Sequence, residues 1–275
     1  MTRKRLFKIL FRWTLFSFVL QCSVFFLLNT YFFKSDGTIT SKKIVSAKED
    51  NSKVADISIP SKAKNIKMSF DGKYISYLLD GELKTINVRN GELIDIPINS
   101  HSKLLNYTWL KDRNRLFLSQ LDNGFINLYY YDLSKNHKEK ISAEGKGTTN
   151  GEITKGNKYT KVKSIETSTL TNVTYLNIEK ENYKKIYRLD INLEVRPFQL
   201  PTDEVGEIKV IPHEDRLIFE NKNNYDIYAT SPNKRITKGK DTKYTLLSVD
   251  NNDVIYIGVL NDHNKILEIK YGTLE

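Results

Sequence analysis

Short runs of β-branched and aromatic residues recur along this chain at nearly constant intervals, and this repetition restricts its possible folds more than any other feature. The runs of one class follow an acidic or Asn/Gly-bearing turn and are marked by Ile75, Phe117, Tyr175, Ile218 and Ile255, at intervals of 42, 58, 43 and 37 residues. A second class follows each of these after a short polar turn and is marked by Val88, Tyr131, Leu189, Tyr228 and Ile269, at intervals of 43, 58, 39 and 41 residues. Two strand classes that keep the same spacing predict a repeat of antiparallel strands.

A repeat of about 40 residues is typical of β-propeller blades, small sheets that pack on their neighbours around an axis. The sequence therefore predicts an all-β fold, a β-propeller of five to six four-stranded blades over residues 54–275. The alternative is an open β-sandwich pair, which predicts strand spacing without a strict period. The 58-residue interval between the second and third repeats is longer than the others, which leaves open whether residues 143–151 are an insertion or a degenerate sixth blade. Residues 55–59 are candidates for an outer strand that closes the ring on the last blade.

The first repeat also carries a recognisable motif. Residues 69–77 read SFDGKYISY, and residues 87–92 read NVRNGE. This pattern resembles the blade repeat of TolB-like and prolyl-oligopeptidase-type β-propellers, in which S-P-D-G-K leads into a strand and a later strand ends in D-x-x-x-G. Phe70 replaces the usual Pro, and Asn87 replaces the usual Asp. A looser copy lies within residues 109–133.

The resemblance covers residues 54–271 and implies the propeller fold without implying an activity. In the prolyl-oligopeptidase family the hydrolase is a separate α/β domain, and we expect no room for it in 275 residues.

The N-terminal 33 residues predict a membrane anchor. Residues 1–12 carry five basic residues and no acid, and residues 13–33 carry no charge. Those 21 residues would span about 32 Å as a helix, close to the roughly 30 Å hydrocarbon core of a bilayer. The basic flank predicts that the N-terminus stays in the cytoplasm. We therefore expect a cytoplasmic tail (1–12), one transmembrane helix (13–33), a stalk (34–53) and an extracellular propeller (54–275) on the cell membrane.

Two other interpretations of this segment fit its residues less well. A cleaved signal peptide would need small residues before its cleavage site, where this chain has Tyr31, Phe32 and Phe33. A lipoprotein would be attached at Cys22, but Gln21 stands where such a motif has a small residue. Cys22 is the only cysteine, which excludes an intrachain disulfide and a Cys-rich zinc site.

The net charge of +10 comes from 43 Lys and Arg against 33 Asp and Glu. Because residues 1–33 hold five of the bases and no acid, the remainder has 38 bases and 33 acids, a net of +5. This mildly basic surface predicts no nucleic-acid partner and is compatible with attraction to anionic lipid or cell-wall polymers.

No motif predicts catalysis, a metal site or a cofactor. The four histidines lie far apart in the sequence and lack metal-ligand spacing. The recurring aspartates of the turns, namely Asp71, Asp112, Asp215 and Asp253, are expected to accept local backbone N–H groups. The expectation from sequence is therefore that the chain is not an enzyme.

Two features are candidates for binding. The Gly/Thr/Lys-rich loop at 143–151 offers Lys146, Thr148 and Asn150, because functional residues concentrate on loops held by a rigid scaffold. The loop is otherwise a flexible spacer. Tyr130 should point to the opposite face from Tyr129 and Tyr131, where it either packs between blades or makes an exposed aromatic contact.

These observations predict a non-catalytic scaffold or binding module for a protein or cell-wall polymer of the bacterial envelope. One alternative is an accessory subunit of a membrane enzyme or transporter. Another is a propeller hydrolase or lyase with an unrecognised axial site. Two carboxylates and a histidine at the axis would favour the enzyme, whereas Asn, Thr and apolar groups there would favour binding.

Overall fold

The computed structural model describes residues 3–28, 55–145, 151–181, 183–238 and 242–274. The chain divides into two units, Met1–Ser52 and Lys53–Glu275, and each is described by itself.

The first unit contains one helix, α1 (Arg3–Leu27), whose segment Phe7–Leu27 has a mean hydropathy of 1.6 and could cross a membrane or serve as a signal sequence. The helix begins ten residues earlier than the predicted span. Lys and Arg are good helix formers, so the basic flank continues the helix instead of ending it. Residues 29–33 of the predicted span lie outside the described residues.

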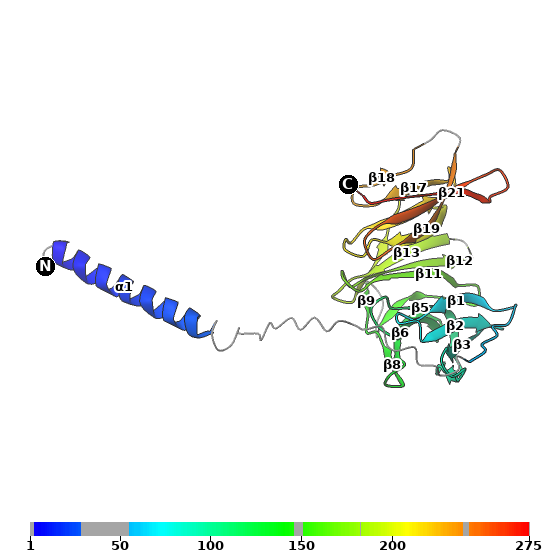
Figure 1. The fold of residues 1–275 in the computed structure, drawn as a ribbon, viewed down its shortest axis with the longest axis horizontal. Helices are drawn as coiled ribbons and strands as arrows, with labels where there is room; N and C mark the ends of the chain where they lie inside the picture. The colour runs from blue at the N-terminus through cyan, green and yellow to red at the C-terminus, as the bar shows by residue number, and fades with distance from the viewer. Residues whose placement is uncertain (1–2, 29–54, 146–150, 182, 239–241, 275) are drawn as a thin grey trace. The chain divides into compact units, whose positions relative to one another are not determined.

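The second unit is a five-bladed β-propeller, which confirms the predicted fold (Figure 1). In every blade, the first three strands pair antiparallel in chain order. Blade 1 contains β1 (Lys64–Met68), β2 (Tyr74–Leu79), β3 (Glu82–Asn87) and β4 (Leu93–Asp95). Blade 2 contains β5 (Lys103–Trp109), β6 (Arg115–Asp122), β7 (Phe125–Asp132), β8 (His137–Lys140) and β10 (Glu152–Lys155).

Blade 3 contains β11 (Lys161–Ser168), β12 (Val173–Lys180), β13 (Tyr183–Leu189), β14 (Glu194–Phe198) and the short β9 (Glu144–Gly145). Blade 4 contains β15 (Val205–Val210), β16 (Leu217–Asn221), β17 (Asp226–Ala229) and β18 (Lys234–Arg235). Among the described residues, blade 5 contains three strands, β19 (Lys243–Val249), β20 (Ile255–Leu260) and β21 (Ile266–Gly272).

The extra residues of the 58-residue interval are an insertion and not a sixth blade. On one side of the insertion, β9 pairs in parallel with β14 of blade 3. On the other side, β10 pairs with β7 of blade 2. The insertion therefore extends the outer edges of two neighbouring blades.

The expected ring closure by residues 55–59 is wrong. The amide of Ala55 donates to the carbonyl of Arg89 in blade 1, with 3.3 Å between N and O. This places the segment at the first blade, and Figure 1 shows the first blade and β21 at opposite ends of the propeller domain.

Four apolar clusters hold the blades together, one at each junction of consecutive blades. Each is built from the alternating inward residues of two facing sheets, as the pleat of a strand requires. Representative buried pairs are Leu83 with Leu118, Phe117 with Leu176, Tyr175 with Phe219, and Ile218 with Leu246. Within the described residues, no such cluster joins blade 5 to blade 1.

Candidate functional site

Charged side chains from the first strand of every blade gather near the centre of the propeller. The first strands lie side by side in chain order, β1 beside β5, β5 beside β11, β11 beside β15, and β15 beside β19. Each carries a charged residue on the strand or just after it: Lys67, Lys111, Glu166, Lys209 and Asp250. We call these five residues the axial cluster.

One ion pair forms within the axial cluster. Lys209 Nζ lies 2.7 Å from Glu166 Oε1, and the two side chains are only 22% and 14% exposed. A second carboxylate, that of Glu207, lies 3.9 Å from the same ammonium group but is more than half exposed. The pair therefore joins blade 3 to blade 4.

Lys67 has no carboxylate within ion-pair distance among the described residues. Its Nζ donates to the carbonyl of Tyr107 at 3.1 Å and to Thr108 Oγ1 at 3.3 Å. Burial lowers the pKa of Lys67 from its ordinary value; Glu166 opposes this shift, and the charge of Lys209 adds to it. Since these charges belong to blades 3 and 4, their influence on a blade 1 side chain shows that the strands converge.

Lys111 is the least compensated cation of the axial cluster. No hydrogen bond or ion pair joins it to another described residue. Burial lowers the pKa of Lys111, with Glu166 and Asp250 raising it and Lys209 lowering it further. Asp250 is itself engaged, because it accepts N–H groups of Asn252 and Val254 at 2.8 and 3.0 Å and the Tyr256 hydroxyl at 3.0 Å.

A cleft of about 290 Å³ between blades 2 and 3 adjoins the axial cluster along the chain. Its walls carry two guanidinium groups, Arg113 and Arg115, on the blade 2 side. The blade 3 side supplies hydroxyl and amide groups from Thr167, Ser168, Thr169, Asn172 and Thr174, together with the carboxylate of Asp190, which pairs with Arg188 at 3.6 Å. Thr167 directly follows Glu166, and Arg113 lies two residues after Lys111, so the cleft and the axial cluster share two segments of chain.

The two arginines of this cleft differ in how they are held. Arg115 pairs with Asp132 at 3.0 Å and lies 5.4 Å from the centre of the Tyr130 ring, yet its Nε is buried without a hydrogen-bond partner among the described residues. Arg113 is 58% exposed and pairs with its neighbour Asp112 at 2.5 Å. A buried N–H without a partner is costly, so a ligand or water oxygen at this point would be favoured.

Tyr130 is the one predicted binding residue that the structure describes. As expected from the alternation of side chains along a strand, Tyr130 packs toward blade 3, whereas Tyr129 and Tyr131 pack toward blade 1. The Tyr130 ring lies edge-to-face on Phe117, with 5.2 Å between the ring centres. It also lines the blade 2–3 cleft. The other three predicted residues, Lys146, Thr148 and Asn150, lie outside the described residues.

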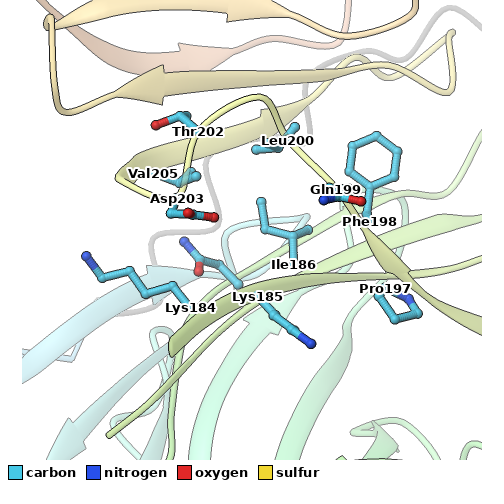
Figure 2. A pocket seen from close by; sticks show the side chains of 11 residues that line it. Lys184, Lys185, Ile186, Pro197, Phe198, Gln199, Leu200, Thr202, Asp203 and Val205 are labelled. Carbon is cyan, nitrogen blue, oxygen red and sulfur yellow. The ribbon is translucent and has the colours of Figure 1, made fainter. Parts of the chain in front are cut away.

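A second cleft, of about 240 Å³, opens between β13, β14 and the segment that leads into β15 (Figure 2). Ile186, Phe198, Leu200 and Val205 in its walls also belong to the blade 3–4 core. Two lysines line it: Lys184 pairs with Glu204 at 2.8 Å, whereas Lys185 has no ion pair among the described residues and lies 5.2 Å from the centre of the Tyr183 ring. This cleft is therefore a partly apolar gap at the edge of the core, with Lys185 and Asp203 as its other charged side chains.

The turn aspartates do more than the sequence predicted. Asp71 accepts the backbone N–H of Lys73 at 3.0 Å, as expected. Asp215 instead accepts the Tyr175 hydroxyl at 2.7 Å and pairs with Arg188, and Asp253 pairs with His213 at 3.0 Å. Both connect neighbouring blades. In the described part of the chain, no three His, Cys, Asp or Glu side chains are grouped as a metal site would require.

Comparison with known proteins supports the fold. No known protein family and no curated protein matches the sequence. Among solved structures, an oligogalacturonate lyase in complex with manganese is 10% identical, with a TM-score of 0.50 over 74% of this chain and 63% of the lyase. The dihydro-heme d1 dehydrogenase NirN in complex with DHE is 12% identical (TM-score 0.45, 75% and 46% covered). A puromycin hydrolase S511A mutant complexed with PGG is 14% identical (TM-score 0.43, 71% and 33% covered).

The likeness to the lyase supports the β-propeller fold of the second unit. The match spans less than two thirds of each neighbour's length. The expectation that the chain is not an enzyme is contradicted, because a protein named as an enzyme, the oligogalacturonate lyase, stands among the neighbours of this fold. The physical reason is that a propeller can assemble a site from residues far apart in the sequence, so a missing local motif excludes nothing.

Proposed function

We propose that this chain is a membrane-anchored β-propeller that binds an acidic polymer of the cell envelope in the blade 2–3 cleft and at the adjoining lysines. The observation that carries the proposal is a set of incompletely compensated cations: among the described residues, Lys67 and Lys111 have no carboxylate at contact distance, and Arg115, although paired with Asp132, has a buried Nε without a hydrogen-bond partner. Hydrogen bonds between cationic donors and carboxylate or phosphate oxygens are about twice as strong as neutral ones.

The neighbouring hydroxyl and amide groups support a sugar-containing ligand. Thr167, Thr169 and Asn172 can donate and accept hydrogen bonds next to the guanidinium groups. Tyr130 adds an aromatic surface at the same cleft. A polymer that alternates anionic groups with hydroxyl-rich units would contact both kinds of group.

Membrane attachment through α1 is part of this proposal. The 21-residue apolar segment Phe7–Leu27 has the length of a span, and the basic residues at its start favour a cytoplasmic N-terminus. The propeller would then face the outer side of the cell membrane, where acidic wall polymers are found.

A direct binding measurement with defined polymers tests the proposal. The full chain in detergent is titrated with polygalacturonate, with inorganic polyphosphate and with neutral dextran. We expect saturable binding to at least one of the two anionic polymers and none to dextran. Equal binding to all three, or to none, would contradict it.

A second candidate function is chemistry on the bound polymer. It is favoured by the lowered pKa of Lys67 and Lys111, because a lysine with a lowered pKa releases its proton more readily and can act as a base. Incubation of each anionic polymer with the full chain, followed by size analysis of the polymer, tests this candidate. Shortening of the polymer that is lost in Lys111→Gln would support it, and an unchanged size distribution would count against it.

A further inference from the structure

The fifth blade ends on an unpaired strand. Blades 1 to 4 each contain at least four strands, whereas blade 5 has the order β19-β20-β21. One edge of β21 pairs with β20, and within the described residues no strand pairs with its other edge. An edge strand of this kind presents a row of free N–H and C=O groups, which is a template for pairing with another strand.

The apolar side chains of β21 are also uncovered. Leu267, Ile269 and Tyr271 are 69%, 55% and 77% exposed. Ile269 lies opposite Gly258 in the register with β20, and Tyr271 lies opposite Tyr256, with 6.1 Å between the rings. Ile257 and Val259 of β20 pack toward blade 4. Because side chains alternate along a strand, Tyr256 and Gly258 face away from that core, and so do Ile269 and Tyr271 opposite them on β21.

The sequence of β21 is complementary to itself in an antiparallel pair. The central residues read Leu267-Glu268-Ile269-Lys270-Tyr271. If two copies pair about Ile269, Glu268 of each lies opposite Lys270 of the other, and Leu267 lies opposite Tyr271. Opposite charges and aromatic–aliphatic pairs across strands each contribute about 0.2–1 kcal/mol, and two-fold symmetry makes every such contact twice.

We propose that two copies of this chain associate through β21, in antiparallel register about Ile269, so that their fifth blades form one continuous sheet. A second copy fits this edge because its Glu268 and Lys270 would lie opposite Lys270 and Glu268 of the first copy. Proteins usually protect an edge with like charges or lysines, whereas Glu268 and Lys270 repel no second copy of the strand. The association is independent of the proposed polymer binding, since no residue of the axial cluster or of the blade 2–3 cleft takes part.

Charge exchange tests the register. The full chain in detergent is examined by size-exclusion chromatography with light scattering over a range of concentrations, and circular dichroism confirms the fold of each variant. Glu268→Lys and Lys270→Glu each place like charges opposite each other twice per dimer, so we expect dimer dissociation constants at least about tenfold higher. The double variant restores opposite charges and should return the dissociation constant to near the wild-type value.

Site-directed crosslinking gives a second, independent readout. In a Cys22→Ser background, Ile269→Cys should crosslink to its own copy through a disulfide or a short bis-maleimide. The matched control, Lys265→Cys, is equally exposed but should not crosslink, because eight residues along an antiparallel pair separate the two cysteines by about 27 Å. Crosslinking at 269 and rescue by the double variant are the expected results. A monomer at all concentrations would overturn the proposal. A dimer that neither charge variant weakens and that does not crosslink at residue 269 would also overturn the proposal, because α1 or another surface would then hold the two copies together.

Discussion

Lys209 of blade 4 donates a hydrogen bond to Glu166 of blade 3, with 2.7 Å between Nζ and Oε1 at the centre of the propeller. Both side chains are mostly buried, so loss of the carboxylate charge leaves the ammonium with only the more distant Glu207. We expect Glu166→Gln to lower the free energy of unfolding by about 1–3 kcal/mol. Denaturant unfolding of the full chain in detergent, followed by tryptophan fluorescence, measures this.

The matched control for that variant is Glu82→Gln. Glu82 also pairs with a lysine at 2.7 Å, but its side chain is 71% exposed. We expect a much smaller change in the free energy of unfolding there, because exposed ion pairs contribute little to stability. Equal effects at the two sites would show that burial of the Lys209–Glu166 pair has no consequence.

Tyr107 should couple blades 1 and 2. Its ring is fully buried, and its hydroxyl donates to the carbonyl of Ser76 at 2.6 Å and lies against the carbonyl of Asn65. Tyr107→Phe keeps the ring but removes the hydroxyl that donates to these carbonyls, so we expect a loss of about 1–2 kcal/mol in the free energy of unfolding. Hydrogen exchange should increase first in β1 and β2. Uniform exchange changes across all blades would argue against a local coupling.

Stability should depend on pH through Asp132. Hydrogen bonds from Ser134 lower the pKa of Asp132, burial opposes the shift, and the pairing with Arg115 lowers it further, to about 2. A carboxyl with a lower pKa in the folded state than in the unfolded state stabilises the fold above the unfolded pKa. That contribution is lost as the pH falls through the folded pKa.

We therefore expect the unfolding midpoint of the wild-type chain to fall between about pH 4 and pH 2. In Asp132→Asn the midpoint should start lower at neutral pH and change less over the same interval. Unfolding curves at a series of pH values give both quantities. Parallel curves for the two proteins would contradict the role assigned to Asp132.

Anchoring by α1 gives a prediction that depends only on the first unit. The full chain should remain in the membrane fraction after alkaline carbonate washing. Replacement of Phe16 and Val19 by Arg, near the middle of the apolar segment, should release it, because each charge at the centre of a span costs about 2.5–3.5 kcal/mol. N-terminal sequencing of the mature protein separates the alternatives, since a new N-terminus beyond Leu27 would show a cleaved signal peptide.

The repeat of the sequence predicted the propeller because its markers lie on equivalent strands. Ile75, Phe117, Tyr175, Ile218 and Ile255 all lie on the second strand of their blades. Their spacing follows from packing: the second strand of a blade lies between two others, and in blades 2 to 4 it is mostly buried, so it needs a long apolar run. The insertion at 143–151 was ambiguous because its short strands β9 and β10 lie at sheet edges, where exposed positions carry little hydrophobic pattern.

The axial cluster could not be predicted in the same way. Lys67, Lys111 and Lys209 resemble any surface lysine in the sequence, and only the convergence of the first strands sets them apart. A signal was nevertheless present. Glu166 and Lys209 are separated by 43 residues and Tyr175 and Asp215 by 40 residues, each about one repeat. Residues one repeat apart lie on facing positions of neighbouring blades, but the spacing alone does not say which of the many such pairs meet.

Binding of an acidic polymer by charge-matched variants tests the central claim most directly. Lys111→Gln with Arg113→Gln removes two cations next to the blade 2–3 cleft, and Lys140→Gln with Lys234→Gln removes two exposed cations from outer strands, so the pairs have equal net charge. For whichever anionic polymer the full chain binds, we expect the first pair to raise the dissociation constant at least about tenfold, or about 1.4 kcal/mol. The second pair should change it less than about twofold. Equal weakening by the two pairs would show that binding follows net charge alone and would contradict a site at the blade 2–3 cleft.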